Sequence, residues 1–129
     1  MLQPKELMLG NWVYLNGDAK YPVRVEAVYT DYVFLQPNAE GFEIFSARED
    51  EICPIPLTEE VFGKNGFEYL TGVFYLKQDS NVEFYKDDDG MFYMSANLCE
   101  YKCMEQPIKY VHQLQNILTI AGIDIDFKI

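Results

Sequence analysis

The chain has 129 residues, of which 49% are apolar and 16% are aromatic, and its formal net charge is −11. The apolar content excludes a disordered chain, and the length suits one compact domain or two very small ones. With 21 acidic and 10 basic residues, the chain would repel a nucleic-acid backbone, so we expect no direct nucleic-acid binding. The acidity favours solubility, or alternatively mimicry of DNA by an acidic decoy.

The sequence also limits where the protein is expected to act. No apolar run approaches the roughly 20 residues that span a bilayer, and residues 1–10 lack the apolar core of a signal peptide. The three cysteines are an odd number and match no secreted disulfide framework. We therefore expect a cytoplasmic protein without a membrane partner.

The first 56 residues predict a series of short strands. Turn signals such as Asn16-Gly17 and Thr30-Asp31 separate them, and Pro54 confines the last strand to a sheet edge. The five expected strands are residues 11–15, 23–27, 32–36, 42–45 and 52–55. Such a meander predicts a small SH3-like β-barrel as a subdomain of residues 1–56.

Residues 57–129 predict a second subdomain that contains both helices and strands. Thr58 is a suitable N-cap and Gly66 a suitable end for a short helix over residues 58–65, after which Phe67 can fold back on Phe62. An antiparallel sheet over residues 73–104 should follow, joined by turns at 78–80 and 87–90, with strands at 73–77, 81–86, 91–94 and 98–104. The aspartates of the second turn are consecutive and lack the spacing of a calcium-binding loop, so they predict a hairpin tip.

The segment 107–121 is the only long stretch with helical periodicity. Pro107 fits the first turn of a helix, and Gly122 fits the position just past its end. The centre of the apolar face consists of Val111, Leu114, Leu118 and Ala121. Residues 123–127 alternate and predict a final strand. The expected class is α+β: a small SH3-like barrel, then an antiparallel sheet packed against one long C-terminal helix.

Cys99 and Cys103, with His112 beyond them, raise the hypothesis of a zinc site. In a strand, residues four apart lie about 13 Å apart, which is too far to share a metal or to form a disulfide. Only a helical conformation of residues 98–104 would bring the sulfurs together, and Cys53 would then have to supply a further ligand. Buried cysteines are therefore favoured, and no metal and no cofactor are expected.

The sequence contains no recognisable catalytic motif. Ser46, Ser80 and Ser95 lie outside any Gly-x-Ser-x-Gly elbow, and zinc-protease, phosphate-loop and dinucleotide-binding patterns do not occur. Carboxylates paired for acid–base chemistry cannot be recognised in one dimension, so an enzyme that uses them stays open as an alternative.

Trp12 is the only tryptophan, and it has two interpretations. It is a core or rim residue of the barrel, or it is an aromatic anchor for a peptide together with Tyr14. Exposure of Tyr14, Tyr29 or Tyr32 would favour the anchor.

His112, Gln113 and Asn116 are expected on the polar side of the long helix, opposite its apolar face. A solvated or hydrogen-bonding role is the ordinary interpretation of such residues. If this side faces a cleft, the three residues form a contact site.

Five short runs resemble a known protein family, and they are Leu9–Val13, Asn16-Gly17, Pro54–Glu60, Lys64–Phe67 and Ile108–Asn116. Together they resemble a family of small uncharacterised Bacteroidetes proteins that are often encoded near phage or mobile-element genes. The run Tyr110–Asn116 is the most specific, and the first run also resembles the opening of SH3-like barrels. The resemblance implies a cytoplasmic, bacterial or phage setting. Since the family carries no assigned activity, it implies no catalytic or ligand residue.

The first functional hypothesis is a non-enzymatic interaction module that contacts an unknown protein partner through an aromatic-rich sheet or barrel surface. An exposed apolar patch would favour it. Carboxylates spaced along one face like duplex phosphates would favour the acidic decoy, and a deep pocket with two close acids would favour an enzyme. An unpaired edge strand would also allow a homodimer.

Overall fold

The structure is a computed structural model that describes residues 2, 4–15, 21–37, 43–77, 79–94 and 107–129. The chain divides into two compact units, and each is considered separately. The first consists of residues 1–56 and 110–116, and the second of residues 57–109 and 117–129. The described elements form two antiparallel sheets and two α-helices, so the fold is α+β, as predicted. None of the described helices is long and apolar enough to span a bilayer.

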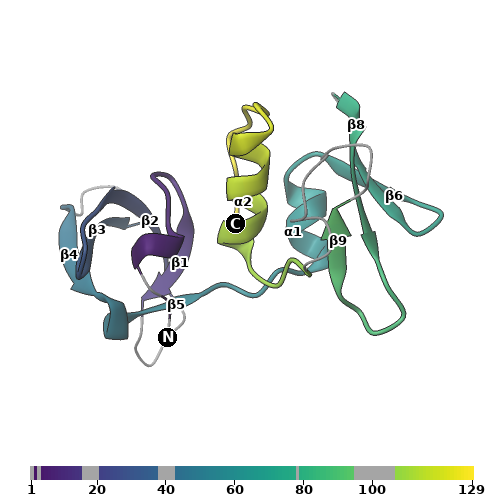
Figure 1. Ribbon diagram of the computed structural model, residues 1–129. Coiled ribbons are helices and arrows are strands. Elements are labelled where there is room, and N and C mark those ends of the chain that lie inside the picture. Colours follow the sequence, from purple (N-terminus) through teal and green to yellow (C-terminus); the bar gives the residue numbers. More distant parts are fainter. Residues whose placement is uncertain (1, 3, 16–20, 38–42, 78, 95–106) are drawn as a thin grey trace. The chain divides into compact units, whose positions relative to one another are not determined.

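The first unit contains a five-stranded antiparallel sheet with the strand order β4-β3-β2-β1-β5 (Figure 1). The 3₁₀ helix η1 (Pro4–Glu6) precedes the sheet, and the 3₁₀ helix η2 (Glu49–Glu51) links β4 to β5. The strands are β1 (Trp12–Leu15), β2 (Tyr21–Val28), β3 (Tyr32–Pro37), β4 (Phe45–Arg48) and β5 (Ile52–Pro54).

Four of the five strands predicted for this unit are confirmed, and the position of the fourth, at 42–45, is wrong. β4 begins at Phe45 and continues to Arg48, with Ala47 as its buried position. Ile44 is 52% exposed and lies before the strand. Phe45 begins the strand and packs partly against the core, Ala47 is buried, and Phe42 lies outside the described residues. Pro54 lies in an edge strand, as predicted.

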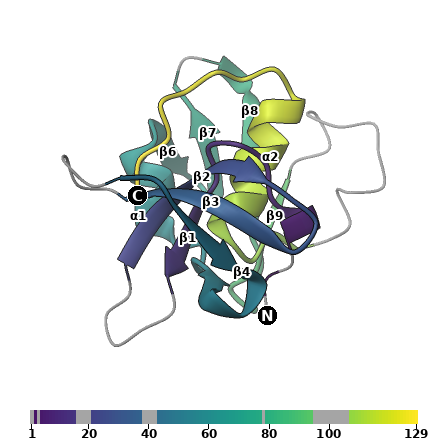
Figure 2. The same cartoon turned by 90° about the vertical axis from the view of Figure 1, so that its left-hand side faces the viewer.

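The short link between β4 and β5 requires the sheet to curl. These strands are its two edges, which a flat five-stranded sheet would hold about 19 Å apart. The three residues of η2 advance only about 6 Å along a 3₁₀ helix. The sheet therefore bends into a half-barrel, as Figures 1 and 2 show. The core inside the unit consists of Leu2, Leu7, Val13, Val23, Val25, Val33, Leu35, Ala47 and Ile52.

The second unit contains a four-stranded antiparallel sheet with the order β6-β7-β8-β9. Its strands are β6 (Phe67–Leu70), β7 (Val73–Leu76), β8 (Asp79–Lys86) and β9 (Phe92–Met94). The predicted strands 73–77, 81–86 and 91–94 are confirmed. The predicted turn at 78–80 is wrong where it includes Asp79 and Ser80, because β8 begins there. The predicted strand 98–104 lies outside the described residues.

β6 was missed because Phe67-Glu68-Tyr69-Leu70 does not alternate between apolar and polar residues. It begins directly after Gly66, which ends the preceding helix with a φ of +83°. That helix, α1 (Glu59–Lys64), follows Thr58 at its N-cap, as predicted.

Phe62, on α1, lies at the centre of the second unit's core. Its side chain is fully buried, and the centroids of four other phenylalanine rings lie 4.7 to 5.6 Å from its own. They belong to Phe67, Phe74, Phe84 and Phe92. The expected contact between Phe62 and Phe67 is therefore confirmed. One face of the sheet packs against α1.

The long C-terminal helix, α2 (Val111–Ile120), is shorter than predicted at its start. Pro107 does not begin it, because the next residues pair as extended chain: the Ile108 N–H donates to the Phe92 carbonyl at 2.7 Å, and the Lys109 carbonyl accepts from the Leu57 N–H at 2.9 Å. The helix ends as predicted. Gly122 adopts a φ of +78°, and the N–H groups of Gly122 and Ile123 donate to the Thr119 and Leu118 carbonyls as a Schellman motif.

The predicted strand 123–127 is wrong, since this segment belongs to neither sheet. A buried side chain, Asn65, replaces the missing strand partner. Its Oδ1 accepts from the Lys128 N–H at 2.6 Å, and its Nδ2 donates to the Lys128 carbonyl and to the Val61 carbonyl, both at 2.8 Å. An alternating sequence therefore lies here outside both sheets, and the Asn65 amide holds the backbone of Lys128 that follows it.

We predict that Phe62→Ala lowers the free energy of unfolding by about 3–5 kcal/mol, because it leaves a cavity among four aromatic rings. Urea unfolding followed by circular dichroism measures the change. Ile120→Ala is the control: its side chain is 78% exposed, and the loss should stay below about 0.5 kcal/mol. Equal losses in the two variants would contradict the central place of Phe62.

Candidate functional site

The first two residues predicted as contacts, Trp12 and Tyr14, lie on β1. Trp12 is only 6% exposed, and the Arg24 guanidinium lies 5.6 Å from the centroid of its ring. Trp12 is therefore a core residue, one of the two interpretations that the sequence left open. Tyr14 is half-buried between Pro22 on β2 and Cys53 on β5.

His112 is not solvated, which corrects the expectation drawn from the helical pattern. It is 2% exposed, and its ring stacks on that of Tyr110 with the centroids 5.9 Å apart. Burial lowers the pKa of His112, and the negative charge of Glu6 opposes this shift. The Nδ1 atom is buried and has no hydrogen-bond partner among the described residues. Burial therefore favours the neutral form of the imidazole.

The other two predicted contacts, Gln113 and Asn116, make hydrogen bonds inside the first unit. The Tyr110 N–H donates to Gln113 Oε1 at 3.1 Å, which caps the start of α2. Asn116 Oδ1 accepts from Asn11 Nδ2 at 2.8 Å, and Asn116 Nδ2 donates to the Glu6 carbonyl at 3.2 Å. These side chains therefore contribute to the fold of the unit.

Gln115 also belongs to this network, although the sequence pattern did not single it out. Its Oε1 accepts from the Trp12 N–H at 2.8 Å, and its Nε2 donates to the Gly10 carbonyl at 3.0 Å. Gln115 is 8% exposed, so it satisfies backbone groups that water does not reach freely. The polar side of the helix is therefore partly an internal surface.

An aromatic patch does lie on the surface of the first unit, at the turn between β2 and β3. Tyr29 and Tyr32 are 48% and 38% exposed and stack with their centroids 4.8 Å apart, and Phe34 packs edge-on against both. A pocket of about 280 Å³ adjoins Tyr32, and it includes Arg48 and Glu51, whose charged groups lie 3.7 Å apart.

A larger apolar surface lies on the outer face of the second sheet. Side chains alternate between the two faces of a strand, so the residues next to the buried phenylalanines point outward. Strand pairing aligns one outward residue from every strand: Leu70 faces Val73, Val73 faces Tyr85, and Tyr85 faces Tyr93. We call this row, consisting of Leu70, Val73, Tyr85 and Tyr93, the apolar stripe.

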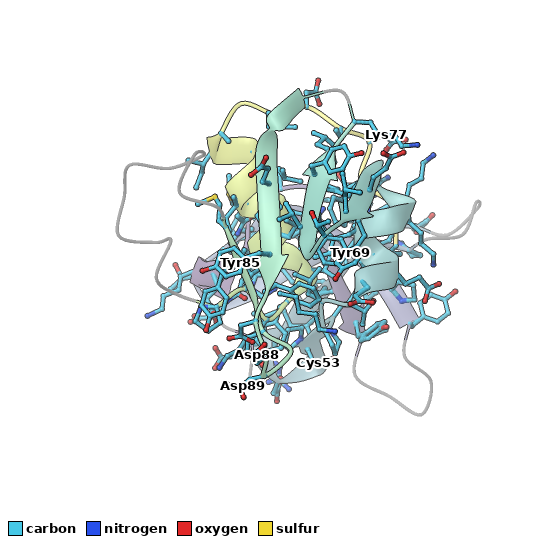
Figure 3. All side chains as sticks on the ribbon, turned by 90° about the vertical axis from the view of Figure 1, so that its right-hand side faces the viewer. Cys53, Tyr69, Lys77, Tyr85, Asp88 and Asp89 are labelled. Carbon is cyan, nitrogen blue, oxygen red and sulfur yellow. The ribbon has the colours of Figure 1, made fainter. Side chains whose placement is uncertain are left out.

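The apolar stripe is partly exposed, with Val73 and Tyr93 half-buried. Leu70 is 59% exposed and Tyr85 is 42% exposed, and the rings of Tyr85 and Tyr93 stack with their centroids 5.4 Å apart. Figure 3 looks onto this side of the sheet, with Tyr85 and Tyr69 on opposite sides of the view. The stripe crosses all four strands.

Carboxylates border the apolar stripe on both sides. The next outward row consists of Glu68, Tyr75 and Glu83, which strand pairing places beside one another. Glu68 accepts a hydrogen bond from the Tyr75 hydroxyl and pairs with Lys77 at 3.0 Å, and these two contacts lower the pKa of its carboxyl. The same hydrogen bond raises the pKa of the Tyr75 hydroxyl.

The opposite border is the turn between β8 and β9, which carries Asp87, Asp88 and Asp89. The Asp87 carboxylate shapes this turn, because it accepts from the Asp89 and Met91 N–H groups at 3.0 and 2.8 Å. The turn lies close to the stripe: desolvation raises the pKa of Tyr93, and Asp87 and then Asp89 raise it further. Figure 3 shows Asp88 and Asp89 at one end of the sheet and Lys77 at the other.

Metal ligands and paired acids are the two kinds of site at issue in the described part of the chain. No three His, Cys, Asp or Glu side chains among them come together as metal ligands. Cys53 is a half-buried free thiol, whereas Cys99 and Cys103 lie outside the described residues. A pocket of about 390 Å³ in the second unit contains Asp124 and Asp126, but both are exposed. Neither therefore has the desolvated environment that prepares a carboxylate for acid–base catalysis.

Comparison of the chain with protein-family models, with curated proteins and with solved structures finds no match. The case for a functional site therefore rests on the chain's own geometry. The apolar stripe is the surface that combines exposure, aromatic side chains and a charged border. Its alternation could be read in residues 73–77 and 81–86, but its continuity across the sheet depends on β6 and on the pairing register.

We predict that lowering the pH from about 7.5 to about 5 destabilises the protein through His112. The folded state depresses the pKa of the imidazole, so the unfolded state takes up the proton first as the pH falls. This contribution to stability is fully present above the ordinary pKa of 6.5 and is lost below it, at no more than about 1.4 kcal/mol per pH unit. Urea unfolding at several pH values measures the slope.

The control for this prediction is His112→Phe, which keeps a planar ring against Tyr110 and removes the only histidine of the chain. Its stability should vary less over the same pH range. An identical slope in the two proteins would show that other groups cause the pH dependence.

Proposed function

We propose that this protein is a non-enzymatic protein-interaction module and that the apolar stripe is its contact surface. The observation that carries the proposal is the alignment of four apolar or aromatic side chains across all four strands, two of them exposed and two half-buried. Contiguous exposed apolar patches mark interaction sites in soluble proteins. Tyrosine suits such a surface because its ring buries a large apolar area and its hydroxyl still finds a polar partner.

We also propose that the first unit is an SH3-like barrel. The support is a five-strand meander in which a three-residue 3₁₀ helix joins the two edge strands, and this requires the sheet to curl. The resemblance to the Bacteroidetes family belongs to the same proposal, and with it a cytoplasmic, bacterial or phage setting.

A second candidate function is an acidic decoy for a nucleic-acid-binding protein, which the net charge of −11 favours. A decoy needs carboxylates that follow one another along a face as phosphates do. Here Glu68, Glu83 and the aspartates of the β8–β9 turn border an apolar stripe, and Glu68 is already paired with Lys77. This arrangement favours recognition of a protein by apolar contact with a charged rim.

A homodimer is a further form that the fold permits. β6 is an edge strand of its sheet and has a neighbour only in β7 among the described strands. Pairing of two β6 edges would join two copies, and analytical ultracentrifugation of the protein would detect the dimer.

We predict that a photoreactive benzoylphenylalanine in place of Tyr85 crosslinks to a protein partner in the cells that encode this chain. The matched control carries the same group in place of Tyr21, which is also 42% exposed but lies on β2. The adduct should form at position 85 and not at position 21. Gel electrophoresis and mass spectrometry identify the adduct.

Adding Leu70→Ser to the Tyr85 photoprobe should lower the yield of this adduct about tenfold, as expected for loss of a strong apolar contact of the stripe. Because Leu70 is 59% exposed, the substitution should leave the fold intact. No adduct at position 85, or the same adduct at both positions, would refute the proposed contact surface.

A further inference from the structure

We infer that the partner of the apolar stripe is an arginine-rich amphipathic protein segment, in which apolar side chains are flanked by guanidinium groups. This inference rests on the proposed function and adds the chemistry of the partner. It follows from the charges around the stripe, from the ion pairs that the described residues already form, and from the type of aromatic ring that the stripe exposes.

Some carboxylates around the stripe form no ion pair with the described cations of the same unit. Among the described residues of this unit, three lysines form ion pairs: Lys64 with Glu60 at 3.3 Å, Lys77 with Glu68 at 3.0 Å, and Lys86 with Glu59 at 3.0 Å. None of these pairs involves the carboxylates nearest to Tyr85 and Tyr93.

Glu83 and the turn aspartates Asp88 and Asp89 have no cation within ion-pair distance in the described part of the chain. Glu83 lies one row from the stripe, next to Tyr75, and the aspartates lie at the turn beyond Tyr85. The stripe therefore has unneutralised negative charge on both sides. A partner with apolar side chains at its centre and cations on both flanks complements this pattern.

The aromatic rings favour arginine over lysine. A guanidinium group stacks on a tyrosine face and still presents its N–H donors to a carboxylate, whereas an ammonium group is more strongly hydrated and lacks the planar fork. Tyr85 and Tyr93 stack on each other beside Asp87 and Asp89, so ring faces and carboxylates lie within the reach of one arginine side chain.

The same charge pattern argues against two other occupants. A second copy of this chain would bring the same acidic borders against the first, and its net charge of −11 adds repulsion. The negative surface of a membrane would be repelled in the same way. Self-association through the stripe and binding of the stripe to an anionic membrane are therefore two results that would contradict the inference.

The test titrates the full chain with three synthetic 12-residue peptides of one amphipathic pattern, in which leucines alternate with flanking arginine, lysine or glutamate. Fluorescence anisotropy gives the affinities, and amide chemical shifts locate the site. The arginine peptide should bind most tightly and shift the amides of Leu70, Val73, Tyr85 and Tyr93. The lysine peptide should bind several-fold more weakly, and the glutamate peptide should not bind.

Two double variants that remove the same charge test the contribution of the acidic turn. Asp88→Asn with Asp89→Asn should weaken binding of the arginine peptide about fivefold. Asp124→Asn with Asp126→Asn is the control, because it removes the same charge from two exposed aspartates of the same unit that lie outside the stripe and its borders, and it should change the affinity much less.

Tyr85→Leu with Tyr93→Leu keeps the stripe apolar but removes the rings. It should weaken binding of the arginine peptide about fivefold and leave binding of the lysine peptide nearly unchanged.

Equal binding of the arginine and glutamate peptides, equal effects of the two aspartate pairs, or chemical-shift changes confined to other surfaces would overturn the inference. A partner crosslinked at position 85 whose contact segment lacks arginine would also overturn it and would leave the proposed function standing. Self-association through the stripe, or binding of the stripe to anionic vesicles, would contradict the assigned partner.

Discussion

The packing of Phe62 against four phenylalanine rings is the interaction on which the candidate surface depends. Once Phe74, Phe84 and Phe92 face α1, the two-residue period of a strand forces Val73, Tyr85 and Tyr93 onto the opposite face. A slip of one residue in any strand would exchange its buried and exposed side chains. The core of the second unit therefore determines which side chains form the apolar stripe.

The acidic turn contributes to the fold and also to the charge around the stripe. Asp87 is used within the turn, where its carboxylate accepts from two backbone N–H groups, and Gly90 adopts a φ of +84°. Asp88 and Asp89 are exposed and make no ion pair among the described residues. A turn that needs only its first aspartate thus carries two further exposed negative charges at the end of the sheet that borders the stripe.

Alternation and turn residues predicted the class of the fold, most strands of both sheets, and the end of α2 at Gly122. The sequence could not place His112, because helical periodicity separates apolar from polar residues but does not show which polar residues meet buried backbone groups. Gln115 hydrogen-bonds to the Gly10 carbonyl and the Trp12 N–H, and Asn116 hydrogen-bonds to the Glu6 carbonyl, so the polar side of α2 is partly internal. Likewise, Ile123–Phe127 alternates as a strand does, but Asn65 holds the adjoining backbone of Lys128 with its side-chain amide.

Charge also distinguishes the apolar stripe from the other exposed aromatic patch. Tyr29 and Tyr32 are at least as exposed as Tyr93, but Arg48 lies in the pocket beside Tyr32 and pairs with Asp50 and Glu51. In that patch Arg48 already pairs with the neighbouring carboxylates, and a basic partner would have to displace the Arg48 guanidinium. At the stripe, Glu83, Asp88 and Asp89 form no such pair among the described residues. A cationic segment placed there would break no ion pair that these residues form, and this difference is the reason for proposing the stripe as the contact surface.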